Sequence, residues 1–270
     1  MNIKILGSGG CVALPRPTCQ CNICKEARKK GEPYKRTGSS LYIEDINIII
    51  DTPEEINYQI NRENIFKVDG IMYSHWDPDH SLGMRVIEQL HEGWRYKVER
   101  IPTKIYGLPE VMDDLLAIKN RFSGYLEYYS NKNLCQIIKG DFFKFNKIEI
   151  KLFPVVTNIV STIFLLSEGE SKVIYAPCDI KPFPMRKEFI SSDILIIGSS
   201  MPKGKKYTEN NPALYYIEEI IEIGRTLNIK KIIITHIEEQ WGIGYDEYKS
   251  MENTFKGYLS FAYDSMHISI

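Results

Sequence analysis

The sequence predicts a layered α/β fold, and three observations lead to this prediction. Short runs rich in Ile, Leu, Val, Phe and Tyr recur along the chain and are bounded by polar turns, which is typical of strands. Segments with apolar residues at helical spacing lie between these runs in irregular alternation. The chain has 270 residues, of which 43% are hydrophobic and 26% are charged, as in ordinary globular proteins. Alternating strands and helices favour an α/β architecture.

The elements can be placed in chain order. The strands expected from apolar runs are residues 2–10, the two halves of 40–52, 69–74, 104–108, 148–156, 161–167, 172–176, 193–199 and 230–235. The helices expected from helical spacing are residues 53–64, 81–93, 109–122, 211–228 and 245–259. Pro53 and the two acidic residues after it suit the first turn of a helix. Residues 10–38 are rich in Pro, Cys, Lys and Arg without periodicity, and we expect a long, metal-pinned loop there.

Length and charge restrict the organisation and the partners. At about 150 residues per domain the length allows one or two domains, and because no linker or repeat divides the chain we expect a single domain over residues 1–270. Lys and Arg number 34 against 35 Asp and Glu, a net charge of -1, which gives no general attraction for long nucleic acids. With no secretion signal and no run of about 18 apolar residues, we expect a cytoplasmic protein without a membrane partner.

Six cysteines are present, and Cys19, Cys21 and Cys24 fall within six residues. Cys19 and Cys21 are too close for an easy mutual disulfide. In a cytosolic protein such spacing indicates a metal site more often than oxidation. The alternative is a chance cluster of reduced thiols.

The central feature is the segment from Ser74 to His80, which directly follows the predicted strand over 69–74. It carries four side chains able to bind a metal ion, namely His75, Asp77, Asp79 and His80. Divalent cations require oxygen and nitrogen donors held close together. The density of such donors at a strand end predicts a metal site here.

Two later residues repeat this arrangement. Asp179 follows the predicted strand over 172–176, and His236 follows the one over 230–235. Taken alone, Asp179 could be a turn cap and His236 a strand-end imidazole. Three strands that end in potential ligands make a shared site the better interpretation. Cys178, beside Asp179, is expected to be a small buried residue beneath a strand end rather than a nucleophile.

At this point the sequence resembles the metallo-β-lactamase superfamily, whose signature is H-x-H-x-D-H followed by a lone His, a lone Asp and a final His. Other motifs resemble the cyclic-phosphodiesterase branch of the carbon-phosphorus lyase pathway for phosphonate breakdown. The motifs that carry the resemblance are His75-x-Asp77-x-Asp79-His80, ILGSGG at 5–10, Cys19-x-Cys21-x-x-Cys24, RTGSSLYIE at 36–44, IIIDT at 48–52, THI at 235–237 and AYDSM at 262–266. The resemblance covers nearly the whole chain. It implies an αββα sandwich with a mono- or dinuclear site for Zn or Mn/Fe.

The resemblance also implies roles for the site residues. Asp79, His80 and His236 would hold one metal ion, and Asp179 would bridge to a second ion held by His75 and Asp77. Asp79 and Asp179 would be the catalytic carboxylates, the first as proton acceptor and the second orienting the nucleophile.

This sequence departs from the pattern at two positions. Asp77 stands in place of the second His, and its anionic oxygen favours harder ions such as Mn, Fe or Mg. Thr157 or Asn158 stands where the lone middle His is expected, and neither is a strong ligand.

The cysteine cluster resembles a structural zinc site of the same family. The resemblance places the fourth ligand three residues after His236, at Glu239. Three thiolates and a carboxylate can make a tetrahedral zinc site, with His267 or water as the other options for the fourth ligand.

The function expected from these observations is metal-dependent hydrolysis of a small phosphodiester, with cyclic phosphodiesters among the candidates, through a metal-bound hydroxide. Two alternatives remain open, because fold alone does not select a substrate. One is a lactonase or other ester hydrolase of the same fold, and the other is a non-catalytic binding protein with a degraded metal site. The expected partner is a small phosphodiester or ester substrate, and a homodimer is left open as the assembly.

Overall fold

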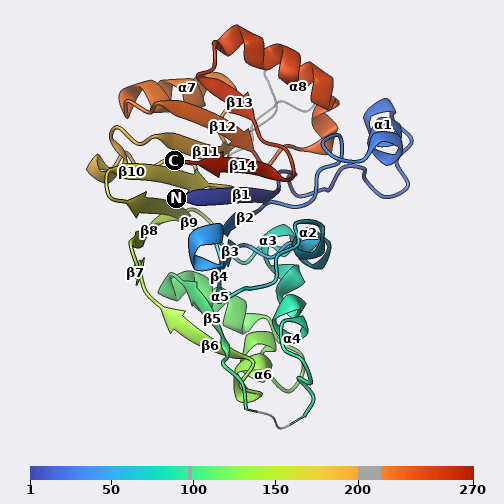
Figure 1. Cartoon of the computed structure of the whole chain (residues 1–270), viewed down its shortest axis with the longest axis vertical. Coiled ribbons are helices and arrows are strands. Elements are labelled where there is room, and N and C mark those ends of the chain that lie inside the picture. Colours follow the sequence, from blue (N-terminus) through green and yellow to red (C-terminus); the bar gives the residue numbers. More distant parts are fainter. Residues whose placement is uncertain (97–98, 200–213) are drawn as a thin grey trace.

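Two mixed β-sheets face each other in the computed structural model of the chain, which describes residues 1–96, 99–199 and 214–270. Within these residues each sheet has seven strands, and helices lie around the two sheets (Figure 1). The expected αββα sandwich is therefore confirmed. No helix among the described residues is long and apolar enough to cross a membrane.

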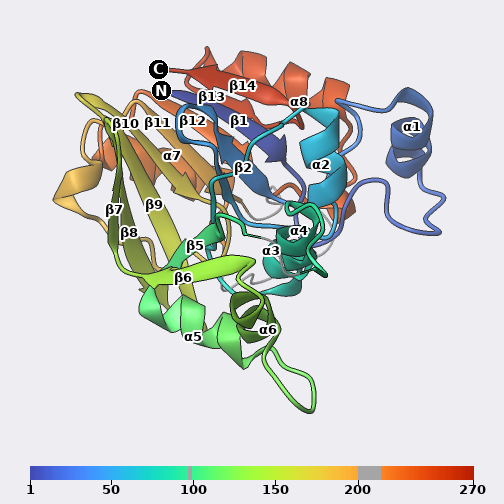
Figure 2. The same ribbon diagram turned by 60° about the horizontal axis from the view of Figure 1, so that its bottom comes forward.

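The first sheet combines an antiparallel and a parallel half. Its strands, in spatial order, are β14 (Met266–Ser269), β1 (Asn2–Gly7), β2 (Ser40–Ile43), β3 (Ile48–Ile50), β4 (Gly70–Met72), β5 (Thr103–Gly107) and β6 (Cys135–Lys139). Pairing is antiparallel from β14 to β3 and parallel from β3 to β6. The pairing of β1 with β14 brings the two termini side by side (Figures 1 and 2).

The second sheet has the same mixed character. Its strands, in spatial order, are β13 (Leu259–Phe261), β12 (Lys231–Thr235), β11 (Ile194–Gly198), β10 (Ser171–Ala176), β9 (Val160–Glu168), β8 (Ile148–Val156) and β7 (Phe142–Phe145). Pairing is parallel from β13 to β10 and antiparallel from β10 to β7. The carboxyl ends of β10, β11 and β12 therefore meet at one edge.

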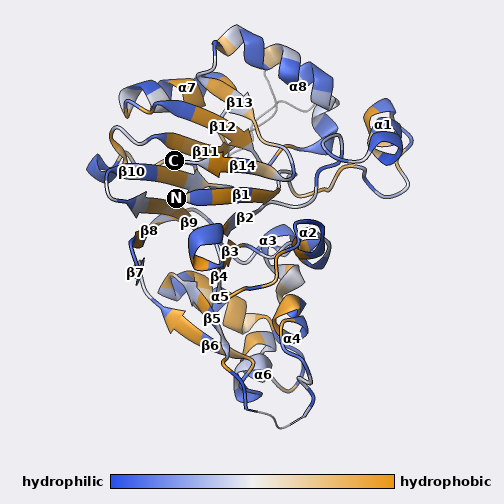
Figure 3. Cartoon of the chain, viewed as in Figure 1, coloured by the Kyte–Doolittle hydropathy of each residue, from blue (hydrophilic) through white to orange (hydrophobic). Residues whose placement is uncertain are grey.

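Eight α-helices occur among the described residues. They are α1 (Asn22–Lys30), α2 (Ile56–Arg62), α3 (Pro78–Ser81), α4 (Val86–Gln89), α5 (Pro109–Ala117), α6 (Tyr125–Asn131), α7 (Ile217–Thr226) and α8 (Tyr245–Glu252). Helix α1 projects from one side of the molecule, away from both sheets (Figure 1). Helices α1 and α8 are largely hydrophilic, whereas hydrophobic residues concentrate in the strands (Figure 3).

The apolar runs of the second sheet are continuous because both of its faces are covered. In β10, Val173 and Tyr175 belong to the core between the two sheets, whereas Ile174 and Ala176 pack into a second core that includes Ile220 of α7. Successive side chains of a strand point to opposite faces, so alternate residues fill the two cores. This packing fixes the register of the strand ends that carry the site.

All the predicted strands are present, and the differences lie in short or polar segments. The strands not predicted are β6, β7, β13 and β14. Residues 78–89 form α3, a 3-10 turn and α4 rather than one helix, and the helix predicted over 245–259 ends at Glu252 so that β13 can begin at Leu259. The helix predicted over 109–122 ends at Ala117. Of the helix predicted over 211–228, α7 is observed, while residues 211–213 lie outside the described residues.

Candidate metal centre

The site is assembled from residues that follow four strands at one edge of the sandwich. Asp51 follows β3, Ser74 and His75 follow β4, Cys178 and Asp179 follow β10, and His236 directly follows β12. Asp51, Asp179 and His236 have positive φ values of 65°, 51° and 53°. Such conformations are uncommon for residues other than glycine and cluster at functional sites. Here they turn the chain sharply at the strand ends.

One group of possible ligands consists of Asp79, His80 and His236. One ligand atom from each residue lies within 4.8 Å of the others. Asp79 Oδ2 is 3.3 Å from His80 Nε2 and 3.4 Å from His236 Nε2. Burial would raise the pKa of Asp79, but its interactions with His236 and His80 hold that pKa well below its usual range. The carboxylate is therefore ionised and faces two imidazole nitrogens.

A second group consists of His75, Asp77 and Asp179, whose ligand atoms also lie within 4.8 Å of one another. His75 Nε2 is 3.5 Å from Asp77 Oδ2 and 3.5 Å from Asp179 Oδ2. Burial, followed by the neighbouring Cys178 sulfur, raises the pKa of Asp179 to about 6. The structure thus places Asp179 with His75 and Asp77, and not in the group of Asp79, His80 and His236.

Cys178 lies between these two groups. Its sulfur forms a third group of ligand atoms within 4.8 Å, together with His75 and His80. Burial would raise the pKa of the Cys178 thiol, but His236, His75 and His80 outweigh burial and lower that pKa well below its usual value. No histidine is near Cys178 in the sequence, which is why sequence reasoning set this residue aside.

The carboxylate of Asp51 is fully buried and orients the ring of His80 through its Nδ1 atom. Its Oδ2 is 2.8 Å from His80 Nδ1, and its Oδ1 accepts a hydrogen bond of 2.7 Å from the Ser74 backbone N–H. The Ser74 hydroxyl is 2.9 Å from His75 Nδ1. A carboxylate at Nδ1 favours the tautomer with a free lone pair on Nε2, which is the arrangement found behind metal-bound histidines. Sequence reasoning missed Asp51, although it ends an apolar strand in the same way as the predicted ligands do.

The site fits divalent metal ions on the evidence of its unpaired atoms. His75 Nε2 and His80 Nε2 are buried and form no hydrogen bond with any described residue. Leaving buried polar atoms unpaired is costly, and both nitrogens point toward carboxylates and the Cys178 sulfur. Imidazole, carboxylate and thiolate donors are the set that Zn and related ions bind.

The cysteine cluster forms a separate group of four possible ligands. The Sγ atoms of Cys19, Cys21 and Cys24 lie 3.3, 3.4 and 3.3 Å from Oε1 of Glu239. Arg16 Nε is 3.2 Å from the other oxygen of Glu239. The segment expected to be an irregular loop contains α1, which begins directly after Cys21. The donor set and its spacing fit a tetrahedral zinc site.

His267, the other option for the fourth ligand of this cluster, lies elsewhere. It belongs to β14, where its Nε2 is 3.0 Å from Glu44 Oε2. Thr157 and Asn158, which stand in place of the middle histidine, are exposed in the turn between β8 and β9. The Thr157 hydroxyl is 3.4 Å from the carbonyl oxygen of Ile159 in the same turn.

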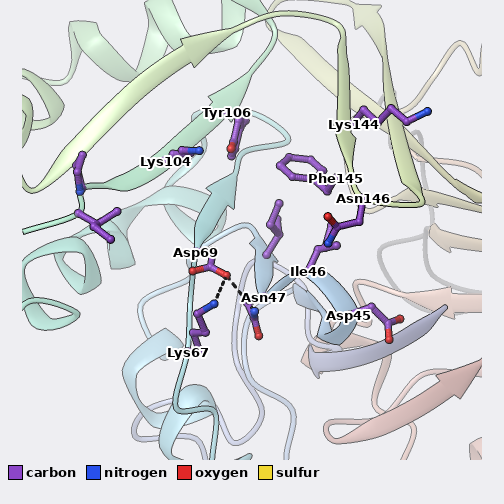
Figure 4. Close-up of a pocket in the computed structure, with 13 residues that line it drawn as sticks. Asp45, Ile46, Asn47, Lys67, Asp69, Lys104, Tyr106, Lys144, Phe145 and Asn146 are labelled. Atoms are coloured by element: carbon purple, nitrogen blue, oxygen red, sulfur yellow. Dashed lines mark hydrogen bonds and ion pairs between the residues drawn. The ribbon is translucent and has the colours of Figure 1, made fainter.

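A cavity of about 470 Å³ lies at the opposite edge of the first sheet, where β3, β4 and β5 begin (Figure 4). Lys67 Nζ is 2.9 Å from Asp69 Oδ2 there, and Lys104 and Tyr106 also line the cavity (Figure 4). The cavity is lined by neither cysteine nor histidine. Ligand sites in sheets of this kind favour the carboxyl ends of parallel strands, which here is the edge that carries the histidines.

With this geometry established, comparison with solved structures shows that the chain has the metallo-β-lactamase fold. A diphosphatase of the PhnP family matches with a TM-score of 0.73 and 18% identity over 99% of this chain and 96% of that one. Zn²⁺-bound PqqB from Methylobacterium extorquens matches with a TM-score of 0.73 and 16% identity over 100% of both chains. Human tRNase Z, short form, matches with a TM-score of 0.66 and 15% identity over 100% of this chain and 99% of that one. No family model and no curated protein matches the sequence.

Proposed function

We propose that this protein is a metal-dependent hydrolase that cleaves a small phosphodiester. The observation that carries the proposal is the convergence of His75, His80 and His236 with nearby carboxylates at one edge of the sandwich. Two of the three structures compared above are named as a diphosphatase and a tRNase, which supports phosphate chemistry within this fold. The net charge of -1 favours a small substrate over a long nucleic acid.

The residues divide into two ligand sets. Asp79, His80 and His236 would hold one divalent ion, and His75, Asp77 and Asp179 would hold the other. Bound divalent ions supply Lewis-acid stabilisation of the charge on a phosphoryl group and make water a better nucleophile at neutral pH.

The chain itself contributes orientation and charge. Asp51 fixes the ring of His80, and Ser74 lies within hydrogen-bonding distance of both Asp51 and His75. Asp79 keeps its negative charge between two imidazoles. Asp179 is half-buried, and its Oδ2 is 3.5 Å from His75 Nε2, the same distance as Asp77 Oδ2. We assign Asp179 the role of orienting the attacking water.

Two basic residues that are close to the predicted ligands in the sequence have carboxylate partners. Arg85 Nε is 2.7 Å from Glu88, and Lys181 Nζ is 3.7 Å from Glu219. Arg85 is therefore held within its own helical segment, whereas the longer and weaker Lys181 pair leaves that ammonium better able to contact a phosphate.

The proposal is tested by turnover of bis(p-nitrophenyl) phosphate and of a small cyclic phosphodiester by protein loaded with Zn or Mn. We expect Asp179→Asn to abolish metal-dependent diester turnover while circular dichroism stays unchanged. Asp113→Asn is the matched control, because Asp113 lies in α5 and pairs with Lys139. Unchanged turnover in Asp179→Asn would refute the assigned role.

A lactone run in the same assay separates the substrate classes. Turnover of the lactone alone would identify an ester hydrolase of this fold. Absence of turnover with every metal would instead identify a binding protein, if metal is bound among the two ligand sets, which together are called the pocket below.

A further inference from the structure

Cys178 occupies a position that a purely structural thiol would not require. It follows β10 and is buried, with 9% of its surface exposed. Cys135 shows the contrast: it is more deeply buried, with 3% of its surface exposed, and its sulfur contacts the carbonyl oxygen of Leu126 at 3.9 Å. Cys178 instead has imidazole neighbours, so the two buried cysteines have different environments.

The sulfur of Cys178 is the atom that joins the two ligand sets. Its group contains His75, from the set with Asp77 and Asp179, and His80, from the set with Asp79 and His236. The Nε2 atoms of His75 and His80 are buried and lack hydrogen-bond partners among the described residues. Because these nitrogens belong to different sets, an atom close to both lies between the two ligand sets.

The neighbouring carboxylate does not occupy this position. Among the described residues, Asp179 groups with His75 and Asp77 and not with His80, and its backbone carbonyl accepts a hydrogen bond of 2.5 Å from the Ser161 hydroxyl. Its positive φ of 51° turns the chain away from the direction of β10. Although Asp179 is adjacent to Cys178 in the chain, its carboxylate therefore lies outside the place between His75 and His80.

We infer that the Cys178 sulfur is a metal ligand shared by the two halves of the centre, in the position that the sequence resemblance gives to Asp179. The inference rests on the proposed metal-dependent hydrolase and deepens it. A thiolate donor favours softer ions such as Zn, Cd and Co. The centre should therefore prefer Zn to Mn or Mg, contrary to the expectation drawn from Asp77 alone.

The test is the absorption spectrum of protein whose pocket is loaded with Co(II). A cobalt–thiolate bond gives a ligand-to-metal charge-transfer band in the near ultraviolet. The cysteine cluster gives a similar band when it takes up cobalt, so the measurement is made in a Cys21→Ser background and again in the wild type as a difference spectrum. Metal content is determined in the same samples by elemental analysis.

We expect Cys178→Ser to lose the pocket's charge-transfer band and to fall from about two pocket equivalents of metal toward one. Cys178→Asp should restore metal binding without the band and should shift the preference from Zn toward Mn. Cys135→Ser is the matched control and should change neither measurement. An unchanged band and metal content in Cys178→Ser would overturn the inference.

A measurement on the wild type covers the case in which Cys178→Ser does not fold. The ¹¹³Cd resonance of cadmium in the pocket should lie in the range typical of sulfur ligation, and a resonance in the range of nitrogen and oxygen ligation alone would overturn the inference. The proposed function fails separately, because it predicts metal in the pocket of the wild type whether or not sulfur is a ligand. A pocket that takes up no metal refutes both, whereas metal without a thiolate signal refutes only the role of Cys178.

Discussion

The pocket and the cysteine cluster are two groups of potential metal ligands that are built in different ways. The pocket gathers its donors from strand ends far apart in the sequence, and those strands are fixed by two hydrophobic cores. The cysteine cluster takes three of its donors from six consecutive residues, beside a small apolar group of Leu14, Cys24 and Ala27. The pocket is thus held by the two large cores, whereas residues 11–35 have a small apolar group and polar contacts such as the hydrogen bond from the Tyr34 hydroxyl to Asp246.

One short segment, residues 236–239, contributes a residue to each of the two groups. His236 points into the pocket, Glu239 points into the cysteine cluster, and Glu238 lies between them. The carboxylate of Glu238 is 3.6 Å from His236 Nδ1 and accepts a hydrogen bond of 3.0 Å from the Cys11 backbone N–H. Local sequence can thus specify one group of potential metal ligands, while the other group requires the whole sandwich. Four predictions test this difference.

The largest effect is expected from His80→Ala. This change removes a buried ligand but leaves both hydrophobic cores intact, so we expect turnover to fall about 1000-fold or more with little change in melting temperature. Turnover and pocket metal content are the measurements, and His267→Ala in exposed β14 is the control. A large drop in melting temperature would contradict the view that the fold holds the pocket.

The cluster should respond in the opposite way. In Cys21→Ser we expect loss of one zinc equivalent and a marked loss of stability, because a structural zinc contributes its binding free energy to folding. Hydrogen exchange should rise in residues 11–35, while the pocket keeps its metal. Cys11→Ser, at an exposed cysteine outside the cluster, is the control. Unchanged zinc content and melting temperature would rule out a structural zinc.

A smaller effect on metal binding is expected from Asp51, whose carboxylate contacts His80 Nδ1. Asp51→Asn weakens the acceptor that orients His80, so we expect pocket metal affinity to fall by about 10- to 100-fold. Metal titration with a competing chelator measures this change. Asp69→Asn, at the opposite edge of the sheet, should leave the affinity unaltered; equal losses in both variants would show a general loss of structure instead.

The smallest effect is expected from Glu239→His. Histidine can replace the carboxylate as the fourth donor to zinc, so the cluster should retain about one zinc equivalent, and only the ion pair with Arg16 is lost. Zinc content after dialysis measures the outcome. A loss as complete as in Cys21→Ser would mean that the carboxylate has a role beyond that of a ligand.

Local sequence patterns were enough to predict the α/β class and most of the strands, and the αββα sandwich was implied by the resemblance to the metallo-β-lactamase superfamily. They also brought attention to His75, Asp77, Asp79 and His80, because these residues are close together in the sequence and follow an apolar run. The helices α1 and α6 and the strands β6, β7, β13 and β14 were missed. These are short or partly polar elements, and pairing with neighbouring strands contributes to their stability as much as their own residues do.

The sequence by itself determined that potential metal ligands collect at strand ends and that three cysteines form a cluster, since both features depend on the local spacing of residues. Only the tertiary structure decided which donors face one another. It placed Asp179 with His75 and Asp77, set Asp51 behind His80, and brought Cys178 between histidines that are about a hundred residues away along the chain. The physical reason is that a strand's register and the turn after it decide which of two adjacent side chains enters the pocket, and packing of both sheets sets that register.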